Sequence, residues 1–180
     1  MTTFRYFAYG SNMLTSRLQT RCQSAVPVMI AHAPDHSVAF HKPSVDKSGK
    51  ATLVTSDGTA SAAAGVVFEI LMSELTKLDN CERGYSRDNS FSVTSLHTGE
   101  CIQAYTYFAE KLQSDLKPYD WYLALVIAGL YQHDLGEDHA SGLREIEFDV
   151  DSQTNRASRL AAIKAMDQAG IPNYESLLTR

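Results

Sequence analysis

Strand-forming segments fill the first two thirds of this chain, and the clearest helical patterns follow Pro118. Before that proline, turn-forming pairs such as Pro34-Asp35 and Asp57-Gly58 separate short runs of β-branched and aromatic residues, which is typical of successive antiparallel strands. The predicted strands cover residues 4–9, 26–33, 37–41, 51–54, 64–70, 89–96 and 101–108. Most of the chain is therefore expected to build one sheet system.

Two helical patterns lie beyond Pro118. Residues 119–131 are apolar on almost every side, which predicts a buried helix, and residues 159–169 have a helical pattern that ends at Gly170. Strands first and helices last favour an α+β fold or a small β-barrel flanked by helices. The length of 180 residues fits a single domain over residues 1–180.

Composition excludes several classes of partner. The net charge of −5 gives no attraction for nucleic acid or for an anionic membrane surface. The longest apolar stretch, residues 121–131, is about half of the roughly 20 residues that span a bilayer, and the first residues lack the pattern of a signal peptide. Cys22, Cys81 and Cys101 have no CxxC spacing, so we expect reduced thiols and a cytoplasmic protein.

The turn after the first strand is the most specific local feature. Gly10, Ser11 and Asn12 favour a turn, and a short helix is expected to follow through Arg21 with Asn12 or Thr15 as its N-cap. This arrangement would direct the backbone amides of residues 10–13 at one point, where an anion or a polarised carbonyl could bind. The alternative is a turn that only reverses the chain and caps the helix.

Glu82 is the second candidate. It lies between a short helix expected over residues 74–78 and the next strand, where loops on a rigid scaffold commonly present functional side chains. The alternative is a solvated carboxylate, since most acidic residues of a globular protein are exposed.

The two features occur together in a pattern that resembles a known family. Residues 6–13, YFAYGSNM, look like the YFAYGSNL/M signature of γ-glutamylcyclotransferase-like proteins, and residues 65–70 are similar to the GVVW-type strand of that family. Residues 78–85 resemble its LDxxEG segment, with Arg83 inserted before Gly84. Tyr122, with Gly129 seven residues later, resembles its YKxxxxxGA-type helix. The resemblance covers residues 4–131 and implies a small mixed or antiparallel β-barrel flanked by helices.

The resemblance also implies a reaction. Family members cyclise a γ-glutamyl group to 5-oxoproline by attack of its own α-amine, which releases the attached amine or amino acid without a cofactor or metal. Glu82 is then the catalytic acid/base. Substrate-binding residues would be Tyr9, Gly10, Ser11, Asn12, Met13 and Tyr122, with the turn amides on the oxyanion or on the substrate carboxylate. A close Arg83 would disfavour a carboxyl group that must exchange protons, so Arg83 is expected to point away.

Other interpretations stay open at this point. Cys81 with a histidine could be a nucleophilic pair. His32 and His36 could share a strand face and bind a metal, although Pro34-Asp35 is expected to break the run. Residues 133–139 are expected to form a solvated, acidic connection. A protein of the same fold could also bind an amine-bearing metabolite without chemistry.

The sequence leaves the released amine and the oligomeric state undetermined. Arg87, Lys42 and residues 111–122 are unranked candidates for contact with the leaving group.

Overall fold

The computed structural model describes residues 1–56 and 62–179. All seven predicted strands are present, with ends that differ by a few residues from the expected ones. The turn expected at Asp57-Gly58 lies outside the described residues. The strands are β1 Thr3–Ala8, β2 Val26–Pro34, β3 His36–Pro43, β4 Gly49–Thr55, β5 Ala62–Leu71, β6 Tyr85–Ser95 and β7 Cys101–Ala109.

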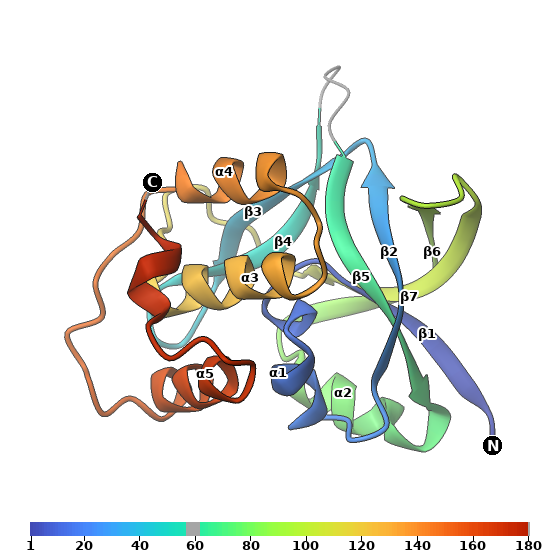
Figure 1. Ribbon diagram of the computed structural model, residues 1–180, viewed down its shortest axis with the longest axis horizontal. Helices are drawn as coiled ribbons and strands as arrows, with labels where there is room; N and C mark the ends of the chain where they lie inside the picture. The colour runs from blue at the N-terminus through green and yellow to red at the C-terminus, as the bar shows by residue number, and fades with distance from the viewer. Residues whose placement is uncertain (57–61, 180) are drawn as a thin grey trace.

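Five strands close into a barrel in the order β1-β7-β6-β2-β5, and β1 pairs with β5 to complete the ring (Figure 1). The β1–β7 pairing is parallel and the other four are antiparallel, so the barrel is mixed. The β3–β4 hairpin extends this barrel through a parallel contact between His36 and Ala62. The expected small barrel within an α+β fold is confirmed.

Gly65 permits the closure of the barrel between β1 and β5. A Cβ atom at this position would lie 2.4 Å from the Ala8 carbonyl oxygen and 2.6 Å from the Phe7 ring, closer than real Cβ atoms approach. Phe7 itself is fully buried, as is Phe68 on β5. The glycine of the GVVF segment therefore allows two strands with bulky side chains to pair.

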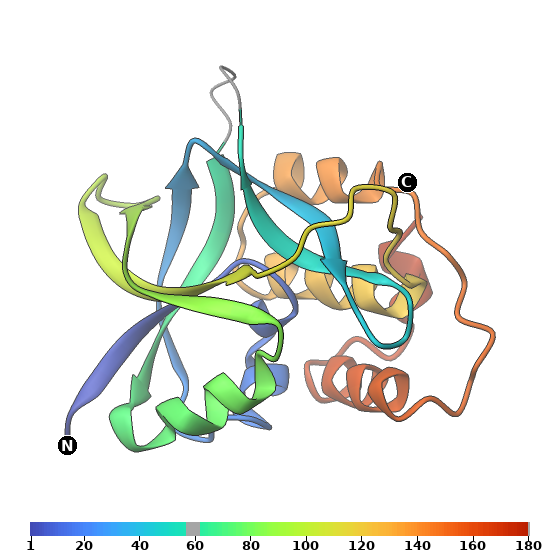
Figure 2. The ribbon, with the colours of Figure 1, turned by 180° about the vertical axis from the view of Figure 1, so that it is seen from behind.

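Helices cover one side and one end of the barrel. Figures 1 and 2 show α3 beside the barrel, with α4 and α5 on either side of it. The α-helices are α1 Thr15–Gln19, α2 Leu75–Cys81, α3 Asp120–Gln132, α4 Glu137–Arg144 and α5 Ala157–Gln168. Short 3₁₀ helices are η1 Ser11–Met13, η2 Met72–Glu74 and η3 Tyr174–Leu177. None of the helices in the described ranges is long and apolar enough to cross a bilayer.

The two helices predicted after Pro118 are confirmed, and a third was missed. Helix α3 is buried from Asp120 to Leu130, as its apolar sequence predicts. The prediction of a solvated connection over residues 133–139 holds for Asp134, Glu137, Asp138 and His139, which are exposed. It is wrong for His133, which is half-buried against the Phe68 ring, and it missed that α4 begins at Glu137. Only Ala140 is buried in α4, so this helix has little apolar signal.

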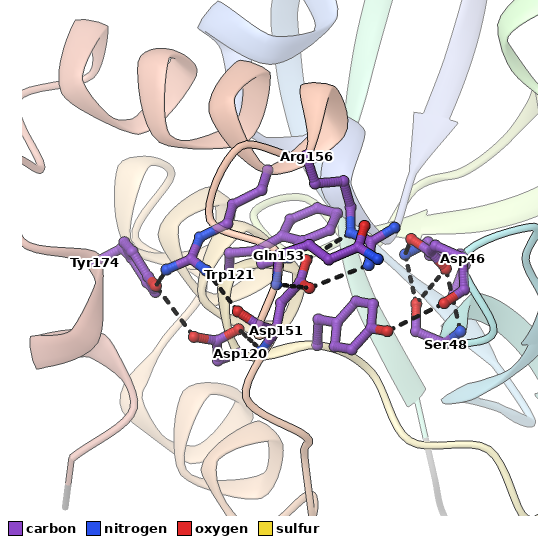
Figure 3. Close-up of polar contacts among 11 residues, drawn as sticks. Asp46, Ser48, Asp120, Trp121, Asp151, Gln153, Arg156 and Tyr174 are labelled. Atoms are coloured by element: carbon purple, nitrogen blue, oxygen red, sulfur yellow. Dashed lines mark hydrogen bonds and ion pairs between the residues drawn. The ribbon is translucent and has the colours of Figure 1, made fainter.

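The C-terminal segment is tied to α3 by buried polar contacts (Figure 3). Asp151 accepts a hydrogen bond from Trp121 Nε1 at 2.9 Å and pairs with Arg156 Nε at 2.6 Å. Asp120 accepts from the Asp151 amide at 3.2 Å and from the Tyr174 hydroxyl at 3.1 Å. The last fifty residues thus cover the helix that carries Tyr122.

Candidate active site

The turn after β1 presents free backbone amides. Among the described residues, no group accepts a hydrogen bond from the amides of Gly10, Ser11 or Asn12. The Met13 amide donates to the Gly10 carbonyl at 2.9 Å. The expectation of four available amides is therefore wrong for Met13, whose amide closes η1.

The expected N-cap is also wrong. Neither Asn12 nor Thr15 caps α1, because the N-cap position is Leu14, and the Thr15 amide donates to Gln132 Oε1 at 2.8 Å. The Thr15 hydroxyl instead contacts His133 Nε2 at 3.1 Å, and the same nitrogen lies 3.1 Å from the Met13 carbonyl. The side chain of Asn12 is turned toward Glu82.

Two glycines fix the position of this turn. A Cβ atom on Gly10 would lie 3.0 Å from Ala51 Cβ and 3.9 Å from the Tyr122 hydroxyl. A Cβ atom on Gly129 of α3 would lie 2.5 Å from Met13 Cβ. The turn is therefore packed between β4 and α3 at distances that larger residues would prevent.

Glu82 reaches this turn from the C-terminal end of α2. Its side chain is 12% exposed, and Oε1 accepts hydrogen bonds from Asn12 Nδ2 and from an Arg21 guanidinium nitrogen, both at 2.8 Å. Asn12 Nδ2 also donates to the Tyr6 hydroxyl at 3.0 Å. The other carboxylate oxygen accepts nothing from the described residues. One oxygen of Glu82 thus fixes the carboxylate, and the other can exchange a proton with a ligand.

Arg21 is a site residue that the sequence reasoning missed. The nitrogen that pairs with Glu82 also donates to Asn12 Oδ1 at 2.9 Å. Burial is the largest single effect and acts to lower the pKa of Arg21, but the charge of Glu82 and smaller contributions from neighbouring groups together raise it. Arg83, by contrast, is exposed and forms no ion pair with Glu82, as expected. The cation beside the carboxylate comes from the first helix region and not from the Glu82 loop.

Glu82 and the turn line one narrow pocket with a volume of about 30 Å³. The lining residues are Tyr6, Tyr9, Gly10, Ser11, Asn12, Ala51, Glu82, Tyr85, Tyr107 and Tyr122. All the candidate site residues except Met13 meet here. Met13 is buried and lines a larger cavity of about 220 Å³, on which Tyr9 also borders.

The tyrosines of the pocket are held by hydrogen bonds. The Tyr9 hydroxyl donates to the Tyr107 carbonyl, and the Tyr122 hydroxyl accepts from the Ala51 amide at 3.1 Å. Burial is the main cause that raises the pKa of Tyr6, Tyr9 and Tyr122 above the usual tyrosine value, and the charge of Glu82 adds to it. These phenols stay neutral and can position a substrate but are poor bases.

The alternative sites receive no support from this geometry. Cys81 is exposed and is not one of the pocket residues. The run of histidines is broken as predicted, because β2 ends at Pro34 and Asp35 adopts a positive φ of 58°. Within residues 1–56 and 62–179, no group of three or more potential ligands could hold a metal ion.

A closed five-stranded barrel with a half-buried carboxylate facing a turn of free amides defines a class of small α+β proteins suited to acid/base chemistry on a polar small molecule. Residues 6–123 match the model of the family described as "Gamma-glutamyl cyclotransferase, AIG2-like". The chain belongs to this family.

Known relatives are similar to this chain over most of its length. The Gamma-glutamylcyclotransferase of Bos taurus is 32% identical over 152 residues, which cover 81% of this chain and 79% of the relative. The Mus musculus protein of the same name is 29% identical over 154 residues, with the same coverage of both chains. A solved structure of a "Gamma-glutamyl cyclotransferase" superposes with a TM-score of 0.80 at 27% identity, covering 91% of this chain and 99% of the other.

Proposed function

We propose that this protein is a γ-glutamylcyclotransferase that converts a γ-glutamyl amine or amino acid to 5-oxoproline and the free amine. The observation that carries the proposal is the Glu82 carboxylate, which Asn12 and Arg21 hold beside the free amides of the turn. The small-molecule site and the family membership agree with this reaction.

The reaction is an internal aminolysis. The α-amine of the glutamyl group attacks the γ-carbonyl carbon, a C–N bond forms in a five-membered lactam, and the C–N bond to the leaving amine breaks. The α-nitrogen goes from an ammonium with three protons to a lactam N–H with one, and the two protons it loses end on the leaving nitrogen, which departs as an ammonium. No water is consumed. A pocket that folds the substrate into a near-attack conformation can lower the barrier by about 7–11 kcal/mol.

Glu82 is proposed to move these protons. Its free oxygen would accept a proton from the α-nitrogen and deliver it to the leaving nitrogen, once for each of the two protons transferred, which is general base and then general acid catalysis. The Asn12 and Arg21 contacts keep the other oxygen in place during both steps.

The amides of Gly10, Ser11 and Asn12 are proposed to bind either the oxyanion of the tetrahedral intermediate or the α-carboxylate of the substrate. Preorganised donors of this kind typically contribute a factor of about 10²–10³ in rate when they face an oxyanion. Tyr9 and Tyr122 would bound the glutamyl group. Met13 would support the turn through its buried side chain, because its own amide donates to the Gly10 carbonyl.

The test is release of 5-oxoproline from γ-glutamyl amino acids, γ-glutamyl-ε-lysine and glutathione by the wild type and by Glu82→Gln. Glutamine keeps the size of the side chain but cannot shuttle the proton, so turnover should fall by about 10²–10⁴-fold. Glu100→Gln changes an exposed carboxylate and should retain full activity. Equal thermal unfolding of the variants would show that Glu82→Gln is folded.

A protein that only binds γ-glutamyl compounds would release no 5-oxoproline from any of them and would bind them equally well as wild type and as Glu82→Gln. That result would overturn the enzymatic proposal.

We also propose a compartment, a domain organisation and a class of partner for this protein. Cys22, Cys81 and Cys101 are all free thiols, which fits a reducing cytoplasm better than an oxidising compartment. The buried side chains form one continuous cluster from Phe4 to Tyr174, which supports a single domain over residues 1–180. We propose action on a small molecule without a cofactor, nucleic acid or membrane partner.

A further inference from the structure

Lys42 lies next to the candidate active site but is not one of the residues that line its pocket. Its ammonium group, on β3, lies 5.1 Å from the centre of the Tyr85 ring, which lines the pocket. A Cβ atom on Gly84 would be 3.2 Å from Lys42 Cε and 3.5 Å from Nζ. Lys42 therefore contacts both the loop that carries Glu82 and an aromatic wall of the pocket.

Three neighbouring cations already have carboxylate partners. Arg21 pairs with Glu82 at 2.8 Å, and Lys50 pairs with Asp46 at 2.9 Å. Arg87, the other single residue considered for the leaving group, pairs with Asp79 at 2.5 Å. Lys42 is half-buried, and no carboxylate of the described residues pairs with it.

The residues around Lys42 make an ammonium group without a carboxylate partner unfavourable. Lys42 is directly opposite Lys50 across the β3–β4 ladder, and like charges in such a cross-strand pair are destabilising. The Tyr85 ring offsets part of that cost through a cation–π contact. An anionic ligand group at the pocket margin would supply the missing counter-charge.

The proposed reaction identifies such a group. The glutamyl half of the substrate is directed to Glu82 and to the turn amides, and Tyr85 lines the same pocket. The leaving half is attached at the γ-carbonyl beside Glu82, so it would lie next to the Glu82 loop. Gly84 and Tyr85 follow Glu82 in that loop.

We propose that Lys42 is a specificity-determining residue that binds the α-carboxylate of a leaving amino acid. This inference rests on the proposed cyclotransferase function. It favours leaving amino acids with a free carboxylate over leaving amines without one.

A matched pair of substrates tests the assignment. γ-Glutamyl-alanine carries the carboxylate, and γ-glutamyl-alaninamide replaces it with a neutral group of the same size. Lys42→Met should lower kcat/KM for γ-glutamyl-alanine by about 10–100-fold, the range of a lost charge-assisted hydrogen bond. The same variant should change kcat/KM for the alaninamide by less than about twofold.

Two further variants control the experiment. Lys42→Arg keeps the charge and should retain most of the preference for the carboxylate. Lys164→Met makes the same change in net charge at an exposed position on α5 and should leave both substrates unaffected. Thermal unfolding of all variants checks that they are folded.

The outcomes separate the two proposals. Equal losses on both substrates in Lys42→Met, or no loss on either, would overturn the role of Lys42 while leaving the cyclotransferase function intact. A wild type that prefers the alaninamide would overturn it as well. If the wild type releases no 5-oxoproline from either substrate, the proposed function fails and this inference fails with it.

Discussion

Arg21 is the side chain that joins the two halves of the candidate site. It donates to Asn12 of the turn and to Glu82 of the α2–β6 loop, so it fixes how these two groups lie relative to each other. We predict that Arg21→Met lowers kcat/KM by at least 10-fold, because the Glu82 carboxylate loses one of the two donors that hold it. Arg21→Lys should recover only part of this loss, because lysine lacks the planar guanidinium.

The measurement is kcat and KM for 5-oxoproline release by the three proteins, with thermal unfolding to show that each is folded. A folded Arg21→Met variant as active as the wild type would show that Arg21 does not position Glu82.

At this scale the sequence predicts only what lies in local motifs. Tyr9, Gly10 and Glu82 could be singled out because each lies in a short segment whose residues resemble a known functional motif. Arg21 could not, since its contact with Glu82 spans 61 positions of the chain and depends on how α1 lies against the end of α2.

At the scale of elements, the contact between α3 and the N-terminal turn decides where the free amides lie. Gly129 allows it, and we predict that Gly129→Ala destabilises the protein by about 1–3 kcal/mol, because the added methyl group would overlap Met13 Cβ and the Leu14 amide. Activity should fall further than stability suggests, since a shifted turn misplaces the amides. Urea unfolding and kcat/KM are the measurements.

Gly142→Ala is the matched control. Gly142 lies within α4, is exposed, and has no atom within 4 Å of an added Cβ. Alanine should therefore stabilise this helix by up to about 1 kcal/mol. If Gly129→Ala were stabilising to the same extent, the close packing of α3 on the turn would be wrong.

The same two helices show why elements differ in how well a sequence predicts them. Helix α3 is apolar all round because it is buried all round, so its pattern stands out. Helix α4 buries only Ala140, and nothing in its composition distinguishes it from a polar loop. The seven strands were found because turn residues separate them, whereas the closure of five of them into a barrel depends on long-range pairing between β1 and β5.

At the scale of the whole molecule, the segment beyond residue 132 completes the core and is not a separate appendage. Trp121 is the neighbour of Tyr122 on α3, and Asp151 of the C-terminal segment accepts the hydrogen bond of its indole (Figure 3). The family match ends at residue 123, so the motif-bearing part of the chain depends on later residues for the burial of its last helix.

Asp151 provides the test of that dependence. Its hydrogen bond and ion pair with Arg156 are the main reason that its pKa is lowered to about 2, with Trp121 and the Gln153 amide contributing. The ordinary aspartate pKa of the unfolded chain is about 3.9, so the folded state holds the ionised form more tightly. This stabilisation is fully present above about pH 4 and is lost as the pH falls through about 2.

We predict that Asp151→Asn lowers the free energy of unfolding at pH 7 by about 2 kcal/mol, because the amide cannot replace the ion pair and Arg156 loses its partner. The difference from wild type should shrink between pH 4 and pH 2, where the wild-type carboxylate becomes protonated as well. Asp149→Asn alters an exposed side chain two positions away and should cost less than about 0.5 kcal/mol. Denaturant unfolding at pH 7 and pH 3 measures both, and equal stabilities of the two variants at pH 7 would show that the C-terminal segment does not hold α3 through Asp151.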